Sequence, residues 1–178
     1  MFILIIASDI PLSLAQFSFA AKQNNMEKKP AFTVIGIAVR TSNQNGQATQ
    51  DIPALWHRFM SNNMAASIPN KISDEIYCMY TDYEKDHTLP YTTLLGCAVR
   101  SLDTIPEGMV GKTVDAGTFV KYTAKGNLVQ GAVYNEWIKI WANTAANRAF
   151  TTDYEIYGAK AANPENGEVD IFVGVKEM

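Results

Sequence analysis

The sequence predicts an α+β protein made of two strand–helix–strand–strand modules related by a pseudo-twofold axis. Three observations support this fold class: the order of expected elements repeats, each copy has one helix that carries tryptophan, and segments 94–99 and 171–176 have similar sequences. One helix covers only one face of its sheet, so we expect the two antiparallel sheets to join edge to edge. The remaining open face would then form a central ligand cleft between the modules.

The first module, about 32–101, begins with a strand over residues 32–41, which are rich in β-branched side chains. Residues 42–50 are polar and predict a loop. Asp51 can cap a helix that holds Pro53 in its first turn. Apolar residues then recur at helical spacing: Ile52, Leu55, Trp56, Phe59 and Met60.

Two further strands, over 75–83 and 92–101, complete the first module. The charged segment 82–90 between them is interpreted as a solvated turn. Tyr80 and Tyr83 are three residues apart, so their side chains point to opposite faces if the strand is regular.

The second module, about 111–177, repeats this order after a turn at Pro106–Gly108. A strand is expected over 114–123, and Asn127 can cap the helix that follows. That helix has its own apolar stripe: Val129, Val133, Trp137, Ile140 and Trp141. Strands over 152–157 and 169–176 end the module.

Length and composition favour a single globular domain. The chain has 178 residues, 47% of them hydrophobic and 19% charged, with a formal net charge of -3. These values exclude a disordered tail protein or a coiled coil, and the mild acidity argues against nucleic acid as a partner. Cys78 and Cys97 lie in apolar runs, which favours buried thiols in the cytoplasm over a single disulfide. His57 and His87 lack zinc-ligand spacing, so we expect neither a metal nor another cofactor.

Residues 1–25 are expected to add nothing to the fold, which we place in residues 26–178. The apolar run 2–7 has no basic residue before it and is too short to cross a membrane, so no membrane partner is expected. Two interpretations stay open: a poor secretion signal, or an extension upstream of a true start at Met26. The second is favoured because Met26 leads directly into the first strand.

Glu155 is the candidate site residue that stands out. Alternation places Asp153, Glu155 and Tyr157 on one face of their strand, opposite Tyr154. A carboxylate on an inner face is costly unless it is paired. From the residues alone, a solvated edge-strand glutamate or one paired with Arg or Lys is the favoured alternative, because carboxylates are seldom buried.

Aromatic residues make up 11% of the chain, and every tyrosine lies at or after Tyr77. Aromatic faces attract cations and stack on flat apolar ligands, with about 0.5–2 kcal/mol available per cation–π contact. Six residues are candidate cleft walls: Tyr80, Tyr91, Tyr157, Phe119, Trp56 and Trp137. Ordinary core packing is the alternative for each, above all for the two tryptophans on helical stripes.

An ordered set of motifs is similar to a known superfamily. The matching segments are Gly36–Thr41, Asp51–Phe59, Ile76–Glu84, Tyr91–Gly96, Pro106–Met109, Gly117–Phe119, Gly126 and Asp153–Tyr157. Together they resemble the effector-binding domains of AraC-type and MerR-type multidrug regulators, the gyrase-inhibitor-like proteins and the integron cassette proteins.

The resemblance implies the duplicated fold and a cleft for hydrophobic, often cationic, small molecules. It also implies that Glu155 anchors the cation, which reverses the preference stated above. Regulators of the superfamily carry a helix-turn-helix domain, and no helical stripe precedes residue 32. We therefore expect a stand-alone domain, monomeric or homodimeric, that sequesters or senses its ligand without contacting DNA.

Two other functions stay open. A hydrolase of reactive small molecules would use Glu155 as general base, with Tyr157 or Tyr91 orienting water. A protein-interaction role would have a transcription regulator or gyrase as partner.

Overall fold

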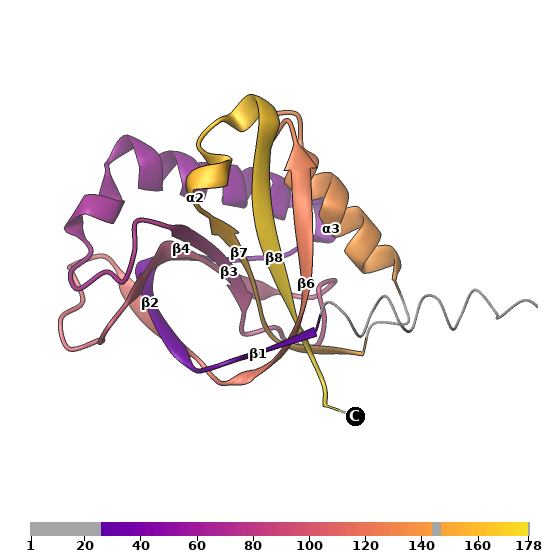
Figure 1. Cartoon of the computed structure of the whole chain (residues 1–178), viewed down its shortest axis with the longest axis horizontal. Helices are drawn as coiled ribbons and strands as arrows, with labels where there is room; N and C mark the ends of the chain where they lie inside the picture. Colours follow the sequence, from indigo (N-terminus) through magenta and orange to yellow (C-terminus); the bar gives the residue numbers. More distant parts are fainter. Residues whose placement is uncertain (1–25, 144–146, 178) are drawn as a thin grey trace, which may run out of the picture.

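The computed structural model describes residues 26–143 and 147–177, so the extension expected over 1–25 lies outside the described residues. Eight strands form one curled antiparallel sheet in the order β1-β6-β8-β7-β3-β4-β2-β5, and helices α2 and α3 lie on the same side of it (Figure 1). The α+β fold class and its duplicated modules are confirmed.

The elements of the two modules correspond one to one. The first contains β2 (Phe32–Thr41), α2 (Ala48–Ser61), β3 (Ile76–Thr81) and β4 (Tyr91–Val99); the second contains β6 (Gly117–Gly126), α3 (Ala132–Ala142), β7 (Arg148–Tyr157) and β8 (Gly167–Val175). Strands β1 (Met26–Lys29) and β5 (Val110–Val114) extend the two edges of the sheet. Short 3-10 helices lie in the connections: Gln44–Gly46, Met64–Ser67, Ala159–Ala161 and Pro164–Asn166.

The modules join where β3 pairs with β7, and Cys78 lies opposite Glu155 in that ladder. Each of the two strands has a tyrosine one residue before the paired residue and another two residues after it, in Tyr77-Cys78-Met79-Tyr80 and in Tyr154-Glu155-Ile156-Tyr157. Antiparallel pairing of two equivalent strands requires a local twofold axis. The matched tyrosines place that axis at the Cys78–Glu155 pair.

Several predicted boundaries differ from the structure. The strand expected from Val114 is two strands, because residues 115–116 turn the chain between β5 and β6. Helix α2 starts at Ala48, and Asp51 lies in its first turn, where it accepts hydrogen bonds from Thr41 and Gln47 instead of capping. Helix α3 starts at Ala132 after a left-handed Gly131, while the Asn127 side chain accepts from the backbone N–H of Gln130 in the preceding turn.

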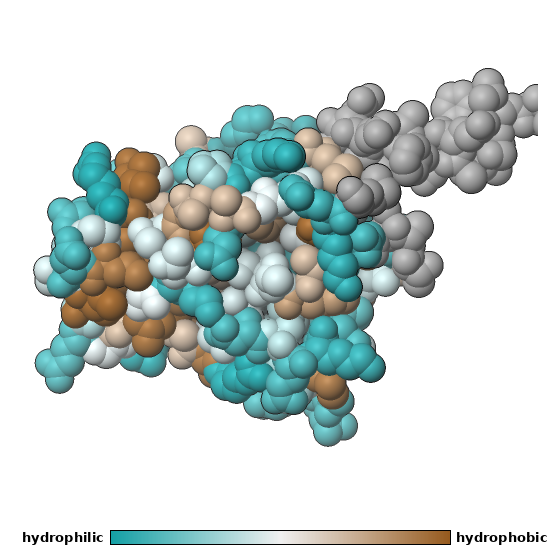
Figure 2. Space-filling view, turned by 90° about the horizontal axis from the view of Figure 1, so that it is seen from below, coloured by the Kyte–Doolittle hydropathy of each residue, from teal (hydrophilic) through white to brown (hydrophobic). Residues whose placement is uncertain are grey.

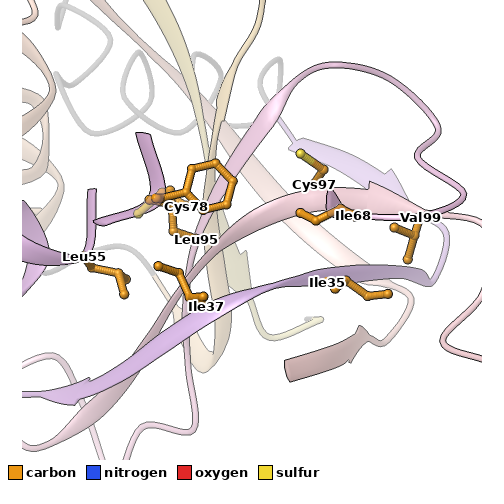
Figure 3. Close-up of a cluster of buried hydrophobic side chains, with 9 residues drawn as sticks. Ile35, Ile37, Leu55, Ile68, Cys78, Leu95, Cys97 and Val99 are labelled. Atoms are coloured by element: carbon orange, nitrogen blue, oxygen red, sulfur yellow. The ribbon is translucent and has the colours of Figure 1, made fainter. Parts of the chain in front are cut away.

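Each face of the sheet packs a separate part of the core. On the helix-bearing side, Ile37 and Leu95 lie toward Leu55 of α2, and Ile35 lies at the other end of the same cluster, near Val99 (Figure 3). The matching cluster of the second module joins Trp137 and Ile140 of α3 to β8. The opposite face, on the inner side of the curl, is filled by a third cluster: Val34, Met79, Leu94, Val114, Phe119, Tyr154 and Phe172.

Figure 2 shows the molecule from the side away from the helices. Hydrophilic side chains predominate there, and hydrophobic ones gather toward one end. Aromatic and aliphatic residues already fill the inside of the curl. Apolar sheet surface that could contact a ligand is therefore left on the helix-bearing side.

Candidate functional site

A cavity of about 400 Å³ lies on the helix-bearing face, between α2, α3 and the central strands. It forms there because α2 covers β2 and β4 while α3 covers β6, which leaves β3 and β7 uncovered between them. The expected central cleft between the modules is therefore confirmed, but it lies on the helix-bearing face and not on the open face, which is closed by the curl and its aromatic core.

The cavity wall is largely aromatic. All three tryptophans of the chain, Trp56, Trp137 and Trp141, line it together with five tyrosines. Among the residues the structure describes, Glu155 is the one carboxylate in this wall, and the wall contains no Lys or Arg. The site thus combines apolar surface with a single ionisable carboxyl group.

Glu155 is 1% exposed and accepts three hydrogen bonds from side chains that also line the cavity. The Tyr80 hydroxyl and the Trp137 indole N–H donate to Oε1 at 2.7 and 2.5 Å. The Tyr157 hydroxyl donates to Oε2 at 2.8 Å. Donors from both modules and from α3 therefore hold the carboxylate at the module junction.

Burial and hydrogen bonding act in opposite directions on this carboxylate. Desolvation raises the pKa of Glu155 above its ordinary value, and the hydrogen bonds from Trp137, Tyr80 and Tyr157 pull that pKa back down. Across the ladder, burial and then the Glu155 charge raise the pKa of the Cys78 thiol, so it stays protonated. The site contains one ionisable carboxylate beside a neutral thiol.

A second buried charge cluster lies behind the cavity wall. Asp153 is fully buried and accepts from Arg148 at 2.5 Å, from the Tyr83 hydroxyl at 2.7 Å and from the Gly174 backbone N–H at 2.9 Å. The Arg148 guanidinium lies 4.4 Å from the Phe150 ring centroid. Since Asp153 has its own cation, its charge is neutralised within the fold, whereas Glu155 has only neutral donors.

The structure brings six of the seven predicted site residues together around the cavity: Trp56, Tyr80, Tyr91, Trp137, Glu155 and Tyr157. Phe119 is the exception. It faces away from α3, unlike Tyr122 and Ala124 of the same strand, and packs on Tyr154 in the cluster inside the curl. Because side chains alternate along a strand, Phe119 lies on the face opposite Tyr122 and Ala124, and this alternation excludes Phe119 from the cavity wall.

The segment 82–90 is more than a solvated turn, because Tyr83 and His87 also line the cavity. Strand β3 ends at Thr81, and Asp82 adopts a left-handed φ of 51°. This turn reverses the alternation, so Tyr80 and Tyr83 reach the same cavity instead of opposite faces. Trp141, in the last turn of α3, belongs to the predicted helical stripe but also lines the cavity, where its ring stacks on His87.

Neither a metal centre nor a membrane segment is found within the part of the chain that the structure describes. No group of three or more His, Cys, Asp or Glu side chains there could hold a metal ion. None of the described helices is long and apolar enough to span a bilayer. Both cysteines are buried and unpaired with each other.

The fold and cavity define an effector-binding α+β domain, and comparison with known proteins gives its family. The chain belongs to the integron-associated effector-binding protein family (Cass2), which it matches over residues 25–175. The resemblance to effector-binding domains is thereby confirmed, and small-molecule binding is the function of this class.

Individual relatives match most of this chain, two of them in solved structure and one in sequence. An integron cassette protein of Vibrio cholerae is 29% identical with a TM-score of 0.67, covering 85% of this chain and 95% of its own. The protein SAV2435, solved with bound tetraphenylphosphonium, has a TM-score of 0.70 at 18% identity, covering 85% and 92%. The Bacillus subtilis (strain 168) protein YobU, named for a transcriptional-regulator role, is 28% identical over 145 residues, 80% of this chain and 91% of YobU.

Proposed function

We propose that the protein binds a hydrophobic organic cation in the cavity and that Glu155 is its electrostatic anchor. The observation that carries this proposal is a buried carboxylate in an aromatic wall without Lys or Arg among the described residues. Burying an ionised carboxylate without a countercharge is expensive. A ligand cation would supply that countercharge, and the tyrosine and tryptophan faces would add cation–π and apolar contacts.

The comparisons support the same ligand class. SAV2435, which has this fold, binds tetraphenylphosphonium, a cation with no hydrogen-bond donor and four phenyl groups. The name of YobU supports a role in which ligand binding is reported to a transcription system. The protein would thus sense or sequester its ligand, with any regulator as a separate partner.

Tryptophan fluorescence tests the proposal directly, because all three tryptophans line the cavity. Titration with tetraphenylphosphonium should quench the emission saturably. A cation about 5 Å from the carboxylate gains roughly 3 kcal/mol at an effective dielectric constant of about 20, part of which is offset by desolvation. Glu155→Gln should therefore weaken affinity about 10- to 100-fold.

Glu165→Gln is the matched control, since Glu165 is exposed in the connection before β8. It should bind like the wild type. Unchanged affinity in Glu155→Gln would refute the anchor, and conversion of the added small molecule to a product by mass spectrometry would point to hydrolysis instead.

A further inference from the structure

His87 is held in the cavity wall by contacts from three other parts of the chain. Its backbone carbonyl accepts from the Asn43 side-chain amide at 2.9 Å. Its ring stacks on Trp141 of α3, with centroids 5.4 Å apart and planes within 4°. It also stacks on Phe150 of β7, at 6.2 Å and 19°. The imidazole therefore has a defined orientation although it belongs to a connecting segment.

The position of Arg148 favours one tautomer of this imidazole. His87 Nδ1 lies 3.5 Å from Arg148 Nη1, and a guanidinium can only donate hydrogen bonds. Nδ1 must then be the acceptor, which puts the proton of the neutral ring on Nε2. Arg148 cannot turn away easily, because its other terminal nitrogen is bound to the buried Asp153. Burial and the Arg148 charge also lower the pKa of His87, which keeps the ring neutral at pH 7.

The Nε2–H of His87 has no acceptor among the residues that the structure describes, and the residue borders the cavity. We propose that His87 is a second ligand-contacting residue, a hydrogen-bond donor that favours cations which also carry an acceptor oxygen. This inference rests on the proposed function and makes the ligand class narrower: a hydrophobic cation with a carbonyl or ether group. Glu155 would hold the charge, and His87 would recognise the oxygen.

A pair of matched probes separates these two contributions. (4-Oxopentyl)triphenylphosphonium carries a ketone, and pentyltriphenylphosphonium has an arm of the same length without it. The wild-type protein should bind the ketone more tightly. His87→Phe keeps an aromatic ring for the Trp141 stack but removes the N–H, so it should weaken ketone binding about three- to tenfold and change pentyl binding less than twofold.

Two further variants keep the result interpretable. His57→Phe is the control, because His57 is exposed on α2 and does not line the cavity. His87→Gln retains an N–H donor and should keep part of the ketone preference. If both probes weaken equally in His87→Phe, or if His87→Phe retains the full ketone preference, the inference is overturned.

The tautomer can be measured without any ligand. The chain has two histidines, so His57→Phe assigns the His87 signals in a long-range ¹H–¹⁵N spectrum of the full protein. At pH 7.5 His87 should be neutral with the proton on Nε2, and its Nε2 signal should shift when the ketone probe is added. An Nδ1–H tautomer, an imidazolium ion, or no shift with bound ketone would overturn the inference. Failure of the wild type to bind either probe would instead refute the proposed function.

Discussion

Tyr157→Phe should shift the pH at which cation binding is lost, because Tyr157 stabilises the ionised form of Glu155. The Tyr157 hydroxyl donates to Glu155 Oε2 at 2.8 Å, and this bond lowers the pKa of a carboxyl group that burial has raised. Removing the hydroxyl therefore raises the pKa of Glu155 further. A cation needs the ionised carboxylate, so binding should be lost at a higher pH in the variant.

The size of the shift follows from the strength of one charge-assisted hydrogen bond. Such a bond is worth about 1.5–3 kcal/mol, and 1.36 kcal/mol corresponds to about one pH unit. Tyr80 and Trp137 still donate to Oε1, so part of the loss is compensated. We expect the midpoint to move up by about one pH unit. Well above the midpoint, affinity should change little, because Glu155 is then ionised in both proteins.

The assay is a series of tetraphenylphosphonium titrations between about pH 4 and 9, followed by tryptophan fluorescence. Affinity should be constant above the midpoint and fall about tenfold per pH unit below it. Tyr77→Phe is the control: Tyr77 is the equivalent of Tyr154, not of Tyr157, and packs beside Tyr154 against the cluster on the opposite face of the sheet. A midpoint that stays in place or moves down in Tyr157→Phe would refute the proposed role of the hydroxyl.

Three further predictions concern stability. The pKa of Glu155 is raised in the folded protein, so its ionisation lowers the stability of the fold as pH rises through that pKa. Glu155→Gln should therefore raise the Tm at pH 8 by about 2–4 °C, and this gain should shrink toward pH 4. A lower Tm of the variant at pH 8 would contradict the prediction. Arg148→Met leaves Asp153 buried without its cation and should cost about 3–5 kcal/mol in urea unfolding, with partial recovery in the double variant with Asp153→Asn. Gly36→Ala would place Cβ 2.1 Å from the Leu95 carbonyl oxygen and should cost about 3 kcal/mol or more, whereas Gly117→Ala, with 3.6 Å to its nearest neighbour, should be tolerated.

The fold was predictable because its elements have strong local patterns. The β-branched run of β2 and the apolar stripes of both helices identify each module on their own, and repetition of their order fixes the topology. What could not be predicted depends on the path of the chain between elements. Asp82, whose φ is left-handed, ends β3 early, and Phe150, also left-handed, accompanies a register shift in β7. Asp tolerates this conformation without requiring it, and Phe rarely adopts it.

The candidate site shows the same division. Strand alternation placed Glu155 and Tyr157 on one face, but the resemblance to effector-binding domains, and not the residues alone, singled out Glu155 as the anchor. Tyr83 and His87 were missed because they reach the cavity from a connection whose sequence is charged and hence looks solvated. The face of the cleft was mispredicted because sheet curvature, which closes one side, arises from the whole set of strand pairs and not from any one segment.

The local twofold axis explains why the site carries one carboxylate and not two. Glu155 and Cys78 are equivalent by the repeat and directly opposite in the β3–β7 ladder, with Tyr80 and Tyr157 as the equivalent donors. Opposed residues in such a ladder lie about 5 Å apart, and two carboxylates at that distance in a buried site would share a proton. A second glutamate at Cys78 would thus raise the pKa of both groups without giving a reliable dianion. A thiol, kept protonated by its surroundings, fills the equivalent position and leaves a single ionisable carboxyl group at the junction of the modules.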